Sequence, residues 1–131
     1  MTDRISGGCL CGRVRIAVSG EPYRVGVCHC LDCRKHSGAP FQAVAIFPAD
    51  AVSIAGEASC FEGRYFCPTC GSPVYAVSGD EVEISLGTFD ETDRFRPSYE
   101  LWTVRRESWL PPLPVVHRYE RDREGEGRTE T

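Results

Sequence analysis

Three cysteines within six positions, Cys28, Cys30 and Cys33, form the most distinctive chemical group of the chain. A Cys-x-Cys step followed by Cys-x-x-Cys turns the sulfurs toward one point on a tight loop, which is the arrangement that a tetrahedral thiophilic ion needs. Zinc is the usual occupant of such sites. Because three ligands leave one coordination position open, the spacing predicts a zinc loop that can accept a further ligand.

Three thiolates also decide which chemistry such a centre would favour. Their charge outweighs that of the ion, so the centre should be a weaker Lewis acid than a zinc held by three histidines and less able to ionise water. A thiol that entered the open position would still lose its proton, because metals bind the thiolate form. The group therefore suits sulfur chemistry better than hydrolysis. His29 or His36 could instead close the shell, which would make the ion structural.

Two further cysteine pairs lie far apart in the sequence. Cys9 and Cys11 stand between glycines in Gly-Gly-Cys-Leu-Cys-Gly, and Cys67 and Cys70 form the Cys-Pro-Thr-Cys of a zinc knuckle. Each pair is half a site. Together they predict a closed four-thiolate zinc site that ties the N-terminal strand to a distant hairpin. Four disulfides are the alternative interpretation of eight cysteines. Cys60 falls outside both groups and is expected to be a half-buried strand residue.

Alternating hydrophobicity predicts that strands carry these loops. Val14, Ile16 and Val18 alternate with charged residues, and the apolar run from 41 to 47 is typical of a strand buried on both faces. Further short strands are expected at 52–54, 58–66, 74–77, 82–87 and 99–102. Helical periodicity is nearly absent, and three prolines exclude a helix from 109 to 114. The sequence therefore predicts an all-β fold of short antiparallel strands, with one domain over residues 5–119 and a disordered charged tail over residues 120–131.

Composition limits the partners that we expect. The chain has 131 residues and a formal net charge of −4, which offers no attraction to a phosphate backbone, so no nucleic-acid partner is expected. No apolar run is long enough to span a bilayer, and the first residues carry no apolar signal core, so no membrane partner is expected. Reduced cysteines in metal sites fit a cytoplasmic location.

The three cysteine blocks, in this order, resemble the family of glutathione-dependent formaldehyde-activating enzymes, the GFA family. The resemblance covers roughly residues 5 to 120 and rests on Gly7–Gly12, on Cys28–Lys35 with Ser37–Ala39 after it, and on Phe66–Ser72. It implies the all-β architecture called a β-tent, with two zinc ions. Position by position, it implies a structural zinc bound by Cys9, Cys11, Cys67 and Cys70 and a catalytic zinc bound by Cys28, Cys30 and Cys33.

The resemblance also implies an activity. Family members form or cleave a carbon–sulfur bond between glutathione and formaldehyde, so we expect a carbon–sulfur lyase whose partners are a small thiol, glutathione or another, and a small aldehyde. Cys28, Cys30, Cys33 and His36 are the expected catalytic residues, and Arg34 and Lys35 the expected substrate-binding residues. The alternative is a zinc-binding module that keeps the fold without the chemistry and serves protein interaction or metal buffering. The oligomeric state is left open, a homodimer included.

Overall fold

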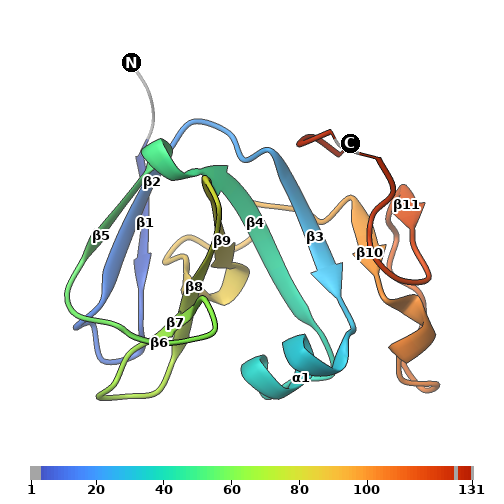
Figure 1. Cartoon of the computed structure of the whole chain (residues 1–131), viewed down its shortest axis with the longest axis horizontal. Coiled ribbons are helices and arrows are strands. Elements are labelled where there is room, and N and C mark those ends of the chain that lie inside the picture. The colour runs from blue at the N-terminus through green and yellow to red at the C-terminus, as the bar shows by residue number, and fades with distance from the viewer. Residues whose placement is uncertain (1–3, 126, 131) are drawn as a thin grey trace.

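The structure is a computed structural model that describes residues 4–125 and 127–130, and in this part of the chain the strands form two sheets (Figure 1). The smaller sheet has the order β1-β2-β5, with β1 at Arg4–Gly8, β2 at Arg15–Ser19 and β5 at Val52–Ala55. The larger sheet has the order β11-β10-β3-β4-β9-β8-β7-β6. Its strands are β3 (Arg24–Cys28), β4 (Gln42–Pro48), β6 (Ser59–Phe61), β7 (Arg64–Phe66), β8 (Pro73–Ser78), β9 (Glu81–Ser85), β10 (Tyr99–Leu101) and β11 (His117–Arg118). The predicted all-β fold is confirmed.

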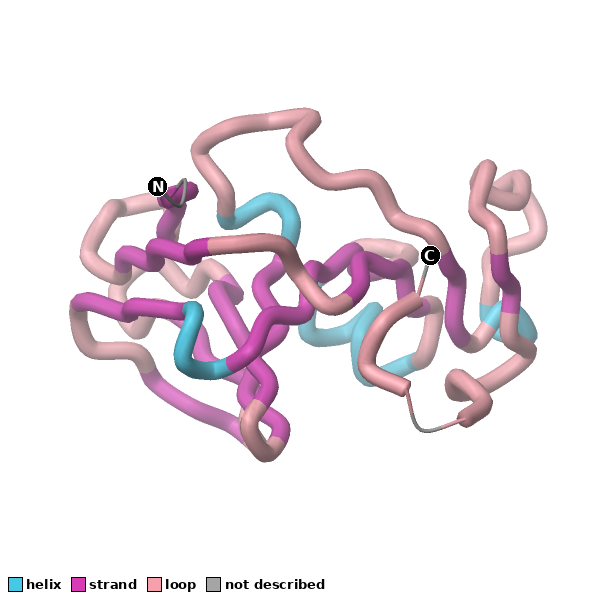
Figure 2. The backbone as a smooth tube through the Cα atoms, turned by 90° about the horizontal axis from the view of Figure 1, so that it is seen from above, coloured by secondary structure: helices cyan, strands magenta, loops and turns pink. Residues whose placement is uncertain are grey.

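Short helical segments join some of these strands, as Figure 2 shows in cyan. The α-helix α1 spans Leu31–Ser37, and the 3₁₀ turns η1, η2 and η3 span Ala49–Ala51, Leu86–Thr88 and Thr103–Arg105. Among the residues that the structure describes, no helix combines the length and the apolar composition needed to cross a bilayer.

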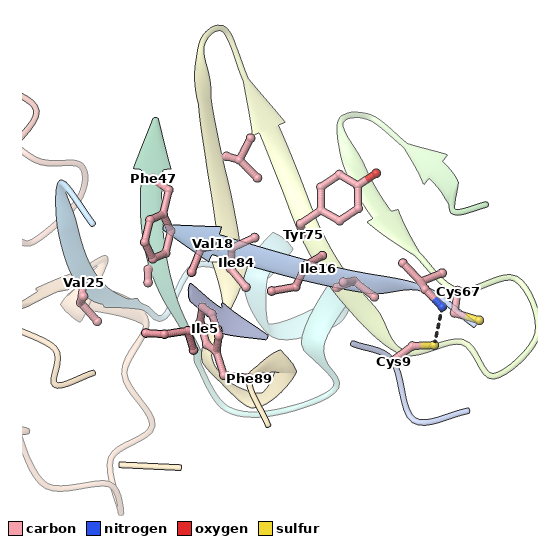
Figure 3. Packing of buried hydrophobic residues seen from close by; sticks show 14 residues of the cluster. Ile5, Cys9, Ile16, Val18, Val25, Phe47, Cys67, Tyr75, Ile84 and Phe89 are labelled. Carbon is pink, nitrogen blue, oxygen red and sulfur yellow. Dashed lines mark hydrogen bonds between the residues drawn. The ribbon is translucent and has the colours of Figure 1, made fainter. Parts of the chain in front are cut away.

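The hydrophobic core lies between the two sheets. Ile16 and Val18 of β2 point into it together with Val14, as their alternation predicted, because in a strand every second side chain points to the same face. Phe47 of β4 meets them from the larger sheet, and Cys9 and Cys67 lie at one end of the packed residues (Figure 3). The sulfur group at that end is therefore continuous with the core.

The larger sheet uses its two faces differently. Val25, Ala45 and Ile84 are opposite one another on β3, β4 and β9, and all three belong to the core. The neighbouring row, Arg24, Ile46 and Glu83, therefore points away from the core. Ile46 is nevertheless only 1% exposed, so the predicted burial on both faces is confirmed for Ala45–Phe47, whereas the first residues of β4 are half-buried.

Three expectations about the elements were wrong. The loop after Cys30 is helical, because Cys30 caps the first turn of α1 and Gly38 ends it in the left-handed conformation. Residues 58–66 form a hairpin of β6 and β7 rather than one strand. The strands are not all antiparallel, since β10 runs parallel to both β3 and β11. The long connection from 86 to 98 makes a parallel return possible, and the sequence pattern alone does not show it.

The C-terminal segment 120–130 contacts the outer side of β3 and the turn between β8 and β9. Arg24 Nη1 donates to the carbonyl oxygen of Arg128 at 2.9 Å, and Arg128 Nη2 lies 2.8 Å from Asp80 Oδ2. Residues 126 and 131 of the expected tail lie outside the described residues. The disorder expected for residues 120–131 stays a prediction. A disordered tail would have to lose the contacts of Arg128 with Arg24 and Asp80.

Candidate functional site

The structure brings four cysteines from two distant hairpins to one point. Cys9 and Cys11 follow β1, and Cys67 and Cys70 stand between β7 and β8, yet all four sulfurs lie within 4.8 Å of one another. The Cys11 sulfur is 3.7 Å from that of Cys9 and 3.6 Å from that of Cys67, which is well beyond a disulfide bond. Every cysteine of the chain is a free thiol. The geometry therefore offers four unpaired sulfur donors to one ion.

Hydrogen-bond donors contact three of these four sulfurs. The backbone N–H of Val14 donates to Cys9 Sγ at 3.3 Å, and that of Cys70 donates to Cys67 Sγ at 3.5 Å. The Ser72 hydroxyl lies 3.2 Å from Cys70 Sγ and lowers the pKa of that thiol to about 5. Four soft donors, three of them with preformed hydrogen bonds, fit a structural zinc ion, because thiolates are the ligands that such sites use.

The second group, Cys28, Cys30 and Cys33, is built by the junction of β3 and α1. Cys28 is the last residue of β3, Cys30 is the N-cap of α1, and Cys33 is in the first turn of that helix. The Cys30 sulfur accepts a hydrogen bond from the backbone N–H of Cys33 at 3.3 Å. The three sulfurs lie within 4.8 Å of one another, and each side chain is half-buried.

The chemistry of this group also fits a divalent cation. Hydrogen bonding from Cys33 lowers the pKa of the Cys28 thiol to about 7, and the same contact raises the pKa of the Cys33 thiol. Three adjacent thiols therefore oppose one another's ionisation, and a cation would remove that opposition. Within residues 4–125 and 127–130, no histidine or carboxylate joins the group at the same distance. A zinc ion bound by these three sulfurs would keep one coordination position open for a further ligand.

A cavity of about 310 Å³ begins at this group and runs along the outer face of the larger sheet. Cys28 and Cys33 line one end, beside Gln42 and Leu101. Val44 and Ile46 of β4 form its floor. The other end is charged and is lined by Arg24, Glu83, Tyr99 and, from the C-terminal segment, Asp122 and Arg123. The cavity is therefore apolar at its centre and connects Cys28 and Cys33 to a charged end.

Residues 4–105 match the family profile described as "Glutathione-dependent formaldehyde-activating enzyme". The chain belongs to this family. Among curated proteins, 77 residues are 31% identical to proteins of Aspergillus flavus and Aspergillus oryzae that are provisionally named glutathione-dependent formaldehyde-activating enzymes. Each match covers 51% of this chain and 40% of the relative. The chain thus covers less than half the length of these relatives.

The three residues that follow the cysteine loop of this GFA-family chain lie outside the cavity. Arg34 Nη2 lies 2.5 Å from Glu107 Oε1, so its guanidinium is held by the segment after η3. Lys35 and His36 line a separate hollow between α1 and the β6–β7 hairpin. Burial and the nearby Arg64 lower the pKa of His36, which keeps its imidazole neutral at pH 7. The substrate-binding role of Arg34 and Lys35 and the proton-carrying role of His36 stay predictions.

His29 stands between Cys28 and Cys30 in the sequence, but its side chain does not join the three-cysteine group. Its ring is fully buried, and Nε2 lies 2.9 Å from Glu100 Oε1, while Nδ1 has no hydrogen-bond partner among the described residues. The ring packs against Phe41, with a distance of 5.7 Å between ring centroids. His29 therefore anchors the turn between Cys28 and Cys30 to β10.

The sequence carried only a weak signal for the rest of the cavity wall in this GFA-family chain. Gln42 is the single polar residue in the apolar run 41–47, and such an exception could have been noticed. Glu83 alternates with Val82 and Ile84, which is the usual pattern of a strand with one solvent face. Nothing in that pattern indicates that the outer face of β9 lies beside the C-terminal segment, some 40 residues later in the chain.

Cys60 lies on β6, outside both sulfur groups, and its side chain is exposed rather than half-buried. The expectation of half burial was wrong because β6 is the edge strand of the larger sheet, with a partner on one side only.

Proposed function

We propose that the protein is a zinc-dependent carbon–sulfur lyase that joins a small thiol, glutathione or a relative of it, to formaldehyde or another small aldehyde, and that cleaves the adduct in reverse. The observation that carries the proposal is the cavity whose end is lined by Cys28 and Cys33. Membership of the GFA family and the names of the curated relatives support the same reaction. We place the activity in the cytoplasm, where small thiols are reduced.

Two metal sites belong to the proposal. Cys9, Cys11, Cys67 and Cys70 would hold a structural zinc ion, and Cys28, Cys30 and Cys33 a catalytic one. When bound by the second group, zinc supplies a positive charge that keeps an additional sulfur ionised at neutral pH.

The reaction balances with one thiol and one aldehyde. The S–H bond of the thiol breaks, a bond forms between sulfur and the carbonyl carbon, and the π electrons of the carbonyl move to its oxygen, which then takes a proton. In reverse, the hydroxyl loses its proton, the carbon–sulfur bond breaks and the thiolate leaves. The protein has to bring the two reactants together and to manage one proton.

The cavity wall supplies the first requirement. Leu101, opposite Cys28 on β10, and Val44 line the reacting end with apolar surface, which excludes water and keeps a small aldehyde from its hydrate. Gln42 is directly opposite Cys28 in the β3–β4 register and on the same face, so its amide is the polar group available to orient the carbonyl. The amide is itself held by a 3.1 Å hydrogen bond from Nε2 to Ser85 Oγ.

His36 is the candidate for the second requirement. It follows Cys33 by three residues in α1, and residues at that spacing project from the same side of a helix. Its imidazole lines the hollow between α1 and the β6–β7 hairpin rather than the cavity, so the proposed proton transfer from the thiol to the hydroxyl would run through a water molecule. Its lowered pKa keeps the imidazole neutral and able to accept that proton.

Exchange NMR with ¹³C-formaldehyde and glutathione tests the proposed activity. We expect the protein to raise the rate of adduct exchange at least about tenfold over buffer, and the variant Cys30→Ser to return the rate to that of buffer. Cys60→Ser, which changes an exposed thiol outside both groups, is the matched control and should keep the wild-type rate. Exchange no faster than in buffer would refute the lyase and favour the zinc-binding module that lacks chemistry.

A further inference from the structure

Glu83 is a carboxylate without a partner at the charged end of the cavity. It lies on β9, faces away from the core, and makes no hydrogen bond or ion pair to any of the residues 4–125 and 127–130. Burial raises the pKa of this carboxyl, Glu81 adds to the effect, and the charge of Arg24 opposes it. An unpaired carboxylate that has lost part of its hydration gains most from a cation or from strong hydrogen-bond donors.

The arginines beside Glu83 are already paired within the chain. Arg24 Nη2 lies 2.9 Å from Glu81 Oε1, and Arg123 Nη1 lies 3.1 Å from Glu130 Oε1. The other terminal nitrogen of Arg24 donates mainly to the backbone carbonyl of Arg128. The other terminal nitrogen of Arg123 donates to the backbone carbonyl of Gly127. These two ion pairs are neutral in sum, so the carboxylates of Glu83 and Asp122 are the charges left over at this end of the cavity. Asp122 Oδ1 already accepts a hydrogen bond from Trp102 Nε1 at 2.9 Å, whereas Glu83 accepts none among the described residues.

The sheet register gives the distance from Glu83 to the sulfur group. Glu83 is opposite Ile46, which is opposite Arg24, so two strand spacings of about 10 Å in total separate β9 from β3 (Figure 1). Cys28 follows Arg24 by about 13 Å along β3. The diagonal between the two Cα atoms is about 16 Å, and side chains that lean into the cavity shorten it to on the order of 10 Å. Glu83 is thus too far away to act on a reacting carbon and close enough to contact the far end of a bound thiol.

We propose that Glu83 binds the ammonium group of the thiol substrate and selects for thiols whose amino group lies far from the sulfur. The γ-glutamyl amino group of glutathione has this placement, because the extended molecule carries it about 10 Å from the sulfur. Cysteine and cysteamine carry an amino group too close to their sulfur to reach Glu83. The inference rests on the proposed function, and it names the residue and the substrate feature that decide which thiol is used.

Calorimetric titration of the purified, metal-loaded protein with glutathione and with N-acetylglutathione tests this role. Acetylation turns the charged amino group into a neutral amide and adds an acetyl group, so the Glu83→Gln variant is needed to separate the charge from the size. We expect the wild-type protein to bind glutathione at least about tenfold more tightly, because hydrogen bonds to charged groups are stronger than those between neutral groups. Glu83→Gln keeps the size of the side chain, and it should lower the affinity for glutathione to that for the N-acetyl compound, with little effect on the latter. Glu57→Gln, at an exposed acidic residue, is the control.

The outcomes separate the two proposals. If wild-type protein and Glu83→Gln bind both thiols alike while glutathione still accelerates adduct exchange, Glu83 does not read the amino group and the lyase stands. If the wild-type protein neither binds glutathione nor accelerates exchange, the proposed function fails and this inference fails with it. Loss of binding of both thiols in a folded Glu83→Gln protein, shown by an unchanged circular dichroism spectrum, would also overturn selection by the amino group.

Discussion

His29 Nε2 and Glu100 Oε1 lie 2.9 Å apart, and neither side chain is exposed to solvent. His29 stands between two of the three clustered cysteines, whereas Glu100 is on β10. The second carboxylate oxygen, Oε2, accepts hydrogen bonds from Arg106 Nη2 at 3.2 Å and from Arg118 Nε at 3.1 Å. One buried carboxylate therefore ties the cysteine turn, the segment after η3 and β11 together.

Glu100→Ala should destabilise the fold. The substitution leaves the buried His29 without its acceptor and the two arginines without their shared carboxylate, and breaking a buried charged pair costs about 3–5 kcal/mol. Urea denaturation would measure the change in the free energy of unfolding. The exposed Glu120→Ala is the control and should change it by less than about 0.5 kcal/mol. Equal midpoints for the two variants would show that the cluster contributes nothing.

The same carboxylate predicts how stability depends on pH. Burial tends to raise the pKa of Glu100, but hydrogen bonds from His29 and Arg106 more than offset it, so the pKa in the folded protein is lowered. A group with a depressed folded pKa stabilises the fold above its unfolded value, about 4.3, and loses that effect as the pH falls through the folded pKa. The stability difference between wild type and Glu100→Gln should therefore shrink below about pH 4. A difference that stays constant from pH 7 to pH 3 would contradict this account.

Gly26→Ala should change the shape of the cavity, because Gly26 and Tyr99 both line it. Tyr99 lies across Gly26 in the parallel β3–β10 pair, and a Cβ atom added at Gly26 would stand 2.2 Å from the phenol ring. The ring would have to move, and overpacking of this kind typically costs about 1–3 kcal/mol. We expect lower stability and weaker glutathione binding together. Unchanged affinity in a destabilised variant would mean that Tyr99 does not shape the site.

The sequence predicted the two groups of cysteines as they occur in space, because their spacing reports directly on loops that can converge. It also predicted Val14, Ile16 and Val18 as core, because a period of two is imposed by the strand itself. It did not predict α1, which is only seven residues long and buries no side chain, so it has no apolar stripe to recognise. Glu83 and Tyr99 were missed for another reason. Their importance comes from register across β3, β4, β9 and β10, which a single sequence does not reveal.

Arg128→Ala should release the C-terminal segment from the charged end of the cavity. Arg128 contacts Asp80 Oδ2 at 2.8 Å and the Tyr23 hydroxyl at 3.1 Å, and its contact lowers the pKa of Asp80. The tie should thus persist at neutral pH and weaken as the pH falls through that lowered pKa. Limited proteolysis should cut residues 120–130 faster in Arg128→Ala than in the control Arg94→Ala. Equal and rapid cutting in all forms, wild type included, would support the disordered tail expected from the sequence.

The two sulfur groups should respond differently to loss of one ligand. Cys67 is fully buried at the edge of the core, so Cys67→Ser removes a structural ligand and should leave an unfolded or insoluble chain. Cys30 is half-buried at the start of α1, so Cys30→Ser should remain folded. Circular dichroism and thermal unfolding would compare the two variants. A soluble Cys67→Ser protein that unfolds cooperatively near the wild-type temperature would contradict the assignment.

The most direct test of the account is the number of zinc ions bound to each folded chain, measured by native mass spectrometry. We predict two ions in the wild-type protein and one in Cys30→Ser, and we expect only the ion of the three-cysteine group to be removed by a mild chelator while the chain stays folded. Two ions in Cys30→Ser, two ions of equal resistance to the chelator, or no ion in the wild-type protein would contradict the claim that one sulfur group holds the fold and the other serves the reaction.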